Sequence, residues 1–185
     1  MLTREAPGLG EHEKWMRAAL EEARLAARLG EVPVGAVVVR EGELLGRGHN
    51  IRESEKSPLG HGELVAITSA CQAVGDWRLS GCTLYVTLEP CCMCAGACLN
   101  ARLERVVYGA ADPLAGCLGS RIDLFRMELE GAPPPRILGG VLEEDCAALL
   151  REFFLLQRRR DTGGTPAGAP RAPARKPGKI PKKHP

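Results

Sequence analysis

The amino-acid sequence predicts an α/β fold, in which helices pack against a β-sheet. Segments with apolar residues three and four positions apart alternate along the chain with short β-branched runs, a pattern typical of helices alternating with strands. The chain has 185 residues, of which 44% are hydrophobic and only 4% aromatic. One domain with a core built mainly from Leu, Val, Ile and Ala is therefore expected.

The first third of the chain predicts a helix followed by a hairpin. Residues 11–29 carry apolar side chains at helical spacing and end at a glycine. His12 in this helix is interpreted as a surface residue. Residues 34–40 and 43–49 have extended character and are joined by a two-residue turn, which predicts an antiparallel hairpin. Residues 50–60 are polar and contain a proline, so we expect a loop there.

Helices and strands continue to alternate further along the chain. Residues 61–74 have a helical stripe, and residues 82–88 predict a strand. Pro90 is well placed to open a helix over residues 91–99, because proline suits the first helical turn. The remaining expected elements are strands at 105–108 and 136–138, a short helix at 122–127 and a last helix at 143–157.

The composition changes sharply near residue 158. Residues 1–157 carry 16 Lys and Arg against 22 Asp and Glu, whereas residues 158–185 carry nine against one. The second segment is also rich in Pro, Gly and Ala, a composition that buries too little apolar surface to fold. We therefore expect a folded domain over residues 1–157 and a disordered, basic tail over residues 158–185.

The sequence predicts a protein of a reducing, cytoplasmic setting. The longest apolar runs fall far short of the roughly 20 residues that a membrane span needs, and acids occur throughout the N-terminal segment, unlike a signal peptide. The chain contains eight cysteines but is too long for a small scaffold stapled by disulfides. Reduced thiols and metal ligands are therefore expected.

Two short motifs together indicate a catalytic metal centre. They are His61-x-Glu63 and, after twenty-six intervening residues, Pro90-Cys91-x-x-Cys94. Imidazole and thiolates are preferred ligands of Zn²⁺, so His61, Cys91 and Cys94 are expected to hold one zinc ion per subunit, with water in the fourth position. Zinc lowers the pKa of bound water from 15.7 toward about 7. Glu63 is placed to move protons to and from that water.

Other interpretations of these cysteines stay open at the level of the motifs. Cys91-x-x-Cys94 between a strand and a helix is also the arrangement of thiol redox proteins such as thioredoxin. A structural zinc site would need a fourth ligand, for which Cys92, Cys98 and Cys117 are candidates. Cys92 is adjacent to a ligand on the same helix, and packing in the core is the simpler role for it.

The sequence around the metal motifs extends the pattern in both directions. The additional runs are residues 30–39 (GEVPVGAVVV), 83–91 (TLYVTLEPC), 93–97 (MCAGA), 105–110 (RVVYGA) and 145–150 (DCAALL). Together with the His-x-Glu and Pro-Cys-x-x-Cys signature of zinc deaminases, they resemble the bacterial tRNA-specific adenosine deaminases, a branch of the cytidine deaminase superfamily. The resemblance covers nearly all of residues 13–157.

The resemblance implies a fold and a reaction. The fold would be a three-layer α/β/α cytidine-deaminase-like sandwich with a central mixed five-stranded sheet. The reaction would be hydrolytic deamination of adenosine to inosine at the wobble position, the first anticodon base, of tRNA. Zinc-activated water would attack C6 of the adenine, and Glu63 would act as the proton shuttle. The family also implies a homodimer.

Further residues match positions that in the family lie near the anticodon loop. Asn50 matches a base-contacting asparagine, and a side-chain amide both donates to and accepts from a purine, although a loop asparagine is also an ordinary turn residue. Asp112, Phe153 and Phe154 match neighbouring positions, with core packing as the alternative for the two phenylalanines. Three arginines that lead into the tail are expected to contact RNA phosphates, unless the tail serves solubility alone: Arg158, Arg159 and Arg160.

The rim of the expected pocket departs from the family pattern. Gly60 and Gly62 flank His61 where alanine is usual, and Leu59 stands where threonine is frequent. These changes affect the fit of the substrate rather than the metal ligands. A zinc-dependent deaminase of a free nucleobase or nucleoside (guanine, adenine or cytosine) is the alternative enzyme, because the same chemistry serves all of them. A zinc-stabilised RNA-binding module is the alternative from another class.

Overall fold

The computed structural model describes residues 8–127 and 133–163, with side chains up to residue 160. The described elements follow the order expected from the sequence. The helices are α1 (Leu9–Arg28), α2 (Gly62–Val74), α3 (Cys92–Asn100), the 3₁₀ turn η1 (Leu124–Arg126) and α4 (Glu143–Gly163). The strands are β1 (Gly35–Arg40), β2 (Glu43–His49), β3 (Thr83–Leu88), β4 (Arg105–Ala110) and β5 (Arg136–Leu138). Within the described ranges, no helix is long and apolar enough to cross a membrane.

The five strands form one mixed sheet, as expected, in the order β2-β1-β3-β4-β5. β1 is antiparallel to both β2 and β3, whereas β3, β4 and β5 run parallel to one another. The predicted hairpin is the β1–β2 pair, with a register irregularity between Val38 and Val39. Leu88 pairs with Ala110 at the carboxyl ends of β3 and β4. The segments that follow these two strands therefore leave the sheet at the same edge.

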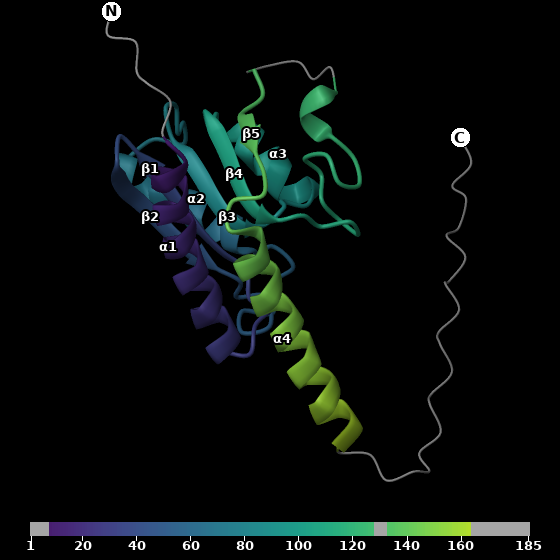
Figure 1. The fold of residues 1–185 in the computed structure, drawn as a ribbon. Helices are drawn as coiled ribbons and strands as arrows, with labels where there is room; N and C mark the ends of the chain where they lie inside the picture. The colour runs from purple at the N-terminus through teal and green to yellow at the C-terminus, as the bar shows by residue number, and fades with distance from the viewer. Residues whose placement is uncertain (1–7, 128–132, 164–185) are drawn as a thin grey trace, which may run out of the picture.

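Helices cover both faces of the sheet and complete a three-layer sandwich. α1 and α4 lie over one face, and α2 and α3 over the other (Figure 1). Side chains alternate accordingly, because successive residues of a strand point to opposite faces. Val37 and Tyr85 pack beneath α1, whereas Val38 and Leu84 pack with α2 and α3. Burial on both faces explains why these strands are almost continuously apolar.

Two glycines of β2 let α2 lie close against the sheet. A Cβ atom at Gly46 would come within 2.4 Å of the Ala66 carbonyl oxygen, and one at Gly48 within 2.4 Å of the Ala66 nitrogen and of the Gly62 carbonyl oxygen. These neighbours are backbone atoms of α2, so a larger residue would push the helix away from β2. The close approach fixes the start of α2, where His61 stands.

α4 is longer than the sequence analysis predicts. It runs to Gly163, six residues past the expected end at 157, so residues 158–160 lie on a helix rather than in a disordered tail. The acidic first turn (Glu143, Glu144, Asp145) and the basic last turn (Arg160) complement the helix dipole. Figure 1 shows the C-terminal half of α4 projecting beyond the sheet. The disorder expected from residue 164 onward lies outside the described residues.

The interpretation of His12 as a surface residue is wrong. His12 is only 3% exposed, because α1 packs it onto the sheet. Its Nδ1 lies 3.0 Å from the Tyr85 hydroxyl, and Arg105 Nη1 lies 3.3 Å from its Nε2. A guanidinium only donates, so Nε2 accepts and Nδ1 carries the proton toward Tyr85. Burial and the nearby Arg105 charge lower the pKa of His12, so the ring is neutral.

Candidate active site and metal centre

Two helix N-termini bring the predicted metal ligands together. His61 and Cys91 are the residues immediately before α2 and α3, both in extended conformation, and Cys94 is buried in the first turn of α3. Nδ1 of His61 lies 3.8 Å from Cys91 Sγ and 3.6 Å from Cys94 Sγ. The ligand atoms of all three residues lie within 4.8 Å of one another. The structure thus forms one possible metal site from residues thirty positions apart in sequence.

The spacing of these atoms fits tetrahedral zinc. Zn–N distances of about 2.0 Å and Zn–S distances of about 2.3 Å place the nitrogen and sulfur of a tetrahedral site about 3.5 Å apart. The candidates for a fourth ligand are absent from this group. Cys98 is buried. Cys92 is exposed, so the interpretation of Cys92 as a core residue is wrong. Cys92 Sγ instead lies 2.7 Å from Cys117 Sγ.

Hydrogen bonds within the group favour a thiolate at Cys91. The interactions of Cys91 with Cys94 and with His61 lower the pKa of the Cys91 thiol to about 3. The interaction with the Cys91 thiolate, together with burial, raises the pKa of Cys94 far above its ordinary value. Metal ions bind thiolates, so this arrangement presents one ligand already in the binding form.

Glu63 lies beside the three ligand residues in the first turn of α2. It is only 4% exposed, and its Oε2 atom has no hydrogen-bond partner among the described residues. Burial raises the pKa of this carboxyl group, which favours the protonated form. A buried polar atom without a protein partner is costly, so its position indicates a polar ligand in the adjoining cavity.

These residues open into a cavity of about 210 Å³ at the carboxyl ends of β3 and β4. Its wall includes Asn50, His61, Glu63, Cys91 and Asp112. Asn50 is 8% exposed, and its Oδ1 accepts a hydrogen bond of 2.9 Å from the Gly62 nitrogen. Asp112 Oδ1 accepts from the nitrogens of Leu114 and Ala115 at 2.9 and 3.1 Å. Both residues therefore also shape the loops that carry them.

The glycines around His61 stand where the backbone is crowded. A Cβ atom at Gly60 would come within 3.0 Å of the Arg52 nitrogen, and one at Gly62 within 3.1 Å of the Val34 carbonyl oxygen. These glycines therefore permit a close approach of the backbone on either side of His61 to the loop after β2 and to Val34. Leu59 is 59% exposed and lines a separate groove along α2.

A buried glutamate that the sequence analysis missed holds the loop on one side of the cavity. Glu31 is only 1% exposed, and its two carboxylate oxygens accept from the nitrogens of Ser54 and Glu53 at 2.7 and 3.0 Å. Burial alone would raise the pKa of Glu31, but the donated hydrogen bonds outweigh it and lower the pKa. An acidic residue directly before the apolar run 32–34 is the sequence signal that could have identified it.

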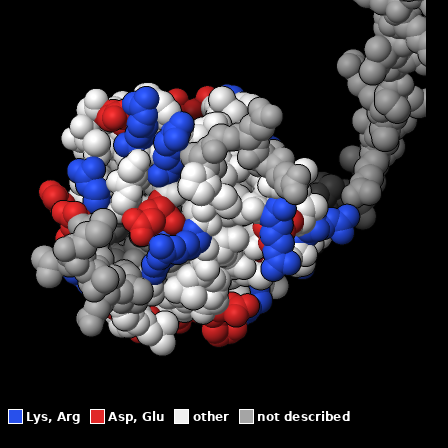
Figure 2. Space-filling view, turned by 90° about the horizontal axis from the view of Figure 1, so that it is seen from above, with Lys and Arg blue, Asp and Glu red and all other residues white. Residues whose placement is uncertain are grey.

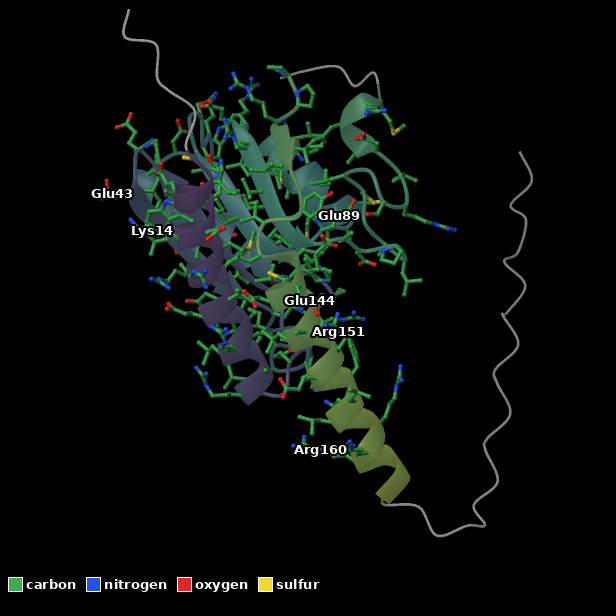
Figure 3. All side chains as sticks on the ribbon, in the orientation of Figure 1. Lys14, Glu43, Glu89, Glu144, Arg151 and Arg160 are labelled. Carbon is green, nitrogen blue, oxygen red and sulfur yellow. The ribbon has the colours of Figure 1, made fainter. Side chains whose placement is uncertain are left out.

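A second buried glutamate holds another loop of the cavity wall. Glu89 is 2% exposed and accepts from the nitrogens of Asp112, Leu118 and Ser120 at 3.1, 2.9 and 3.1 Å (Figure 3). Gly116 makes room for it, because a Cβ atom there would lie 2.4 Å from Glu89 Oε2. Local sequence pattern gives no sign of this role, because Glu89 stands between the expected strand at 82–88 and Pro90.

The predicted RNA contacts of the last helix lie apart from the cavity. Phe154 is 45% exposed and Phe153 is half-buried, with their rings edge to face at 5.5 Å between centroids. Neither belongs to the two core clusters, so Phe154 is not a core residue, whereas Phe153 packs in part beside Ala27 and Leu149. Arg158, Arg159 and Arg160 are exposed on the projecting end of α4, where Figure 3 labels Arg160. None of these residues lines the cavity.

The fold and the site together define a deaminase of the cytidine deaminase type. A family model described as MafB19-like deaminase matches residues 10–142. A solved guanine deaminase from Nitrosomonas europaea shares the fold with a TM-score of 0.62, over 83% of this chain and 96% of that chain, at 21% identity.

Two comparisons identify the branch of this class. A solved tRNA:A34 deaminase, studied for A-to-I editing at the wobble position of transfer RNA, superposes with a TM-score of 0.71 at 40% identity, over 74% of this chain and 99% of that chain. The tRNA-specific adenosine deaminase of Bacillus subtilis (strain 168) is 47% identical over 148 residues, which are 80% of this chain and 91% of the relative. The chain belongs to the family of tRNA-specific adenosine deaminases, as its motifs predict.

Proposed function

We propose that this protein hydrolyses adenosine to inosine and ammonia at the first anticodon position of tRNA, with one zinc ion held by His61, Cys91 and Cys94. The observation that carries the proposal is the unpartnered Oε2 of buried Glu63 beside these three residues, on the wall of a base-sized cavity. The 47% identity to a tRNA-specific adenosine deaminase supports the choice of substrate.

The donor set suits zinc rather than a harder cation. One imidazole nitrogen and two sulfurs are the ligand types that zinc prefers. The two sulfurs lie 3.6 and 3.8 Å from the nitrogen, close to the separation of about 3.5 Å between ligand atoms of a tetrahedral zinc site. A zinc ion bound there would supply a water whose pKa is lowered toward about 7 and a positive charge that polarises the reacting carbon. Three protein ligands leave the fourth coordination position for that water.

Glu63 is the residue that moves protons. Its carboxyl group is buried next to the proposed ligands, and no group in the described part of the chain forms a hydrogen bond with Oε2. It would take a proton from the attacking water, deliver one to N1 of the adenine, and pass one to the departing amine, so that ammonia leaves and inosine remains. A carboxyl placed in this way contributes typically about 10²- to 10⁴-fold to the rate.

Asn50 would recognise the base through its amide NH₂ group. The Oδ1 atom is already engaged by the Gly62 nitrogen at 2.9 Å, so the side chain presents a donor, not an acceptor, to a base in the cavity. Ring nitrogens of a purine are the complementary acceptors. Asp112, which also lines the cavity, would act through the loop that it shapes.

The projecting end of α4 would bind the RNA backbone. Arg158, Arg159 and Arg160 are exposed on α4, whose end projects beyond the sheet where Figure 3 labels Arg160. Phe154 offers an exposed ring for stacking a base. On the face seen in Figure 2, blue and red side chains are mixed and form no single basic field. This supports an RNA contact that is confined to the arginines of α4. Residues 164–185 would add further positive charge from the tail.

A second copy of the chain is the partner that we propose for α2. A groove of about 770 Å³ runs along this helix. The apolar residues that line it are Ile51, Leu59, Leu64, Val65, Ile67 and Ala97. Sedimentation analysis should show a dimer for the native protein and a monomer for Leu64→Glu; a native monomer would contradict the pairing. We place the protein in the cytoplasm, because its eight cysteines are free and form no structural disulfide framework.

The reaction is tested with an anticodon stem-loop carrying adenosine at its first anticodon position. Incubation with the zinc-loaded protein should convert that adenosine to inosine, read by sequencing, while Glu63→Ala retains zinc and loses conversion.

A deaminase of free bases is the second candidate, because a cavity of about 210 Å³ also admits a free base. Ammonia release from guanine, adenine or cytosine without inosine in the stem-loop would overturn the tRNA assignment. Loss of zinc from Glu63→Ala would overturn its role as a proton carrier.

A further inference from the structure

Two cysteines outside the ligand set face each other beside the metal centre. The Sγ atoms of Cys92 and Cys117 lie 2.7 Å apart, closer than either ligand sulfur lies to His61 Nδ1. A disulfide bond has an S–S length of about 2.05 Å. Formation of the bond therefore needs a further approach of only about 0.7 Å.

The backbone on both sides of this thiol pair is already held in place. The Cys117 nitrogen donates to the Pro90 carbonyl oxygen at 2.9 Å, and Cys91 forms a bridge with Gly116. The Cys117 thiol is oriented by the Ala115 carbonyl oxygen at 3.2 Å. Disulfides fail mainly when they force the backbone to move, and here the two chain segments already run together.

The two thiols differ in access to solvent. Cys92 is exposed at the start of α3, whereas Cys117 is 2% exposed. An oxidant in solution therefore reaches Cys92 first, and the sheltered Cys117 is the resolving thiol. We infer that Cys92 and Cys117 form a reversible thiol–disulfide site, oxidised by low-molecular-weight disulfides such as oxidised glutathione.

The exchange proceeds in two balanced steps. The Cys92 thiolate attacks one sulfur of the oxidised glutathione, breaks its S–S bond, and forms a mixed disulfide with release of one glutathione thiolate. The Cys117 sulfur then attacks the Cys92 sulfur and breaks the mixed disulfide, and its proton passes to the departing glutathione thiolate, which leaves as the second thiol. Two cysteines are oxidised and one disulfide oxidant is reduced to two thiols, so an excess of reduced glutathione reverses the reaction.

The site is separate from the residues of the proposed reaction. Neither Cys92 nor Cys117 belongs to the metal-ligand group or lines the cavity. The disulfide would tie the loop that carries Asp112 and Ala115 to the start of α3, next to the cavity wall. Its formation depends on the two thiols alone, so it stands whether or not the tRNA reaction is correct.

Peptide mapping tests the pair directly. The full chain, with one equivalent of zinc added, is incubated with oxidised glutathione, alkylated and digested with trypsin without reduction. Cleavage at arginines yields residues 79–102, with five cysteines, and residues 106–121, with Cys117 alone. We expect these two peptides to be joined, with fragmentation placing the bond at Cys92 and the other four cysteines alkylated. Dithiothreitol should separate them.

Two variants make the result specific. Cys92→Ser should reduce the joined peptide by at least about tenfold, because the exposed attacking thiol is gone. Cys71→Ser, which removes a partly exposed thiol on α2, should leave it unchanged. A bond from Cys117 to Cys91 or Cys94 would overturn the inference. The inference would also be overturned if Cys92 carried glutathione while Cys117 was found alkylated. That result would mean that the Cys117 thiol does not displace glutathione from Cys92.

Discussion

Replacing Glu31 by glutamine tests whether a buried carboxylate holds the loop beside the cavity. The native side chain is 1% exposed and accepts from the nitrogens of Ser54 at 2.7 Å and Glu53 at 3.0 Å. Glutamine has the same shape but only one acceptor oxygen. Its NH₂ group would face one of the two backbone N–H groups, so one bond is lost and replaced by two opposed donors.

The expected destabilisation follows from the number of bonds and their charge. A hydrogen bond to a charged group contributes about 1.5–3 kcal/mol and a neutral one about 0.5–1.5 kcal/mol. Loss of one charged bond and weakening of the other gives about 2–4 kcal/mol at pH 7. No discount for solvent applies, because the carboxylate is buried.

The pH dependence has a definite sign. The donated hydrogen bonds lower the pKa of Glu31 below its usual value of about 4.3. The stabilisation is therefore complete above the usual pKa and is lost as the pH falls through the lowered pKa of the folded state. The difference between native protein and Glu31→Gln should be constant from about pH 8 to 6 and should shrink below about pH 4.

Urea unfolding at a fixed zinc concentration measures this difference. With a slope of about 2 kcal/mol per molar urea, in the middle of the usual range, the midpoint should fall by roughly 1–2 M at pH 7. Glu55→Gln is the matched control, because Glu55 is exposed in the same loop and should change stability by less than about 0.5 kcal/mol. Equal midpoints for the two variants at pH 7 would refute the role assigned to Glu31.

Three other changes test the site and the packing behind it. Glu63→Gln should lower turnover by at least about 10²-fold, measured as inosine formation, with zinc content unchanged by metal analysis; lost zinc would contradict its placement outside the ligand set. Removal of zinc with a chelator should abolish activity, and added Zn²⁺ should restore it; turnover of metal-free protein would exclude the proposed mechanism. Gly48→Ala should lower the free energy of unfolding, measured in urea, by about 1–3 kcal/mol or more, because its Cβ would meet α2 backbone at 2.4 Å. Gly96→Ala is the control, because a Cβ there meets nothing within 4 Å. A Gly48→Ala variant as stable as the native protein would disprove the tight contact.

The metal group and the fold were accessible from the sequence because their signals are local. His61-x-Glu63 and Cys91-x-x-Cys94 each place their residues within one helical turn, so spacing alone predicts which side chains share a helix end. The apolar runs and their breaks predicted the strands, and the family resemblance supplied the central mixed sheet of five strands that the structure confirms. The order of the strands was not predicted. The longer α4 was missed because its last turns are polar and carry no apolar stripe.

Contacts between distant segments were not accessible in this way. His12 and Tyr85 are 73 positions apart, and Cys92 and Cys117 are 25 apart. No periodicity connects such pairs, because each depends on how α1 or a loop docks on the sheet. The exposure of Cys92 was missed for the same reason. Its neighbours in the sequence are small and apolar, and only the packing of α3 in the folded protein shows which side of that helix faces solvent.

The buried glutamates show why the ligand motifs alone do not make a substrate pocket. His61 and Cys91 stand at helix ends, where without the flanking loops they would face open solvent. Glu31 and Glu89 each draw one loop inward by accepting backbone N–H bonds, and the cavity lies between those loops. Neither carboxylate belongs to the metal-ligand group. The residues that could hold a metal and the residues that hold the loops around the cavity are therefore different sets, and only the first set is written in a short motif.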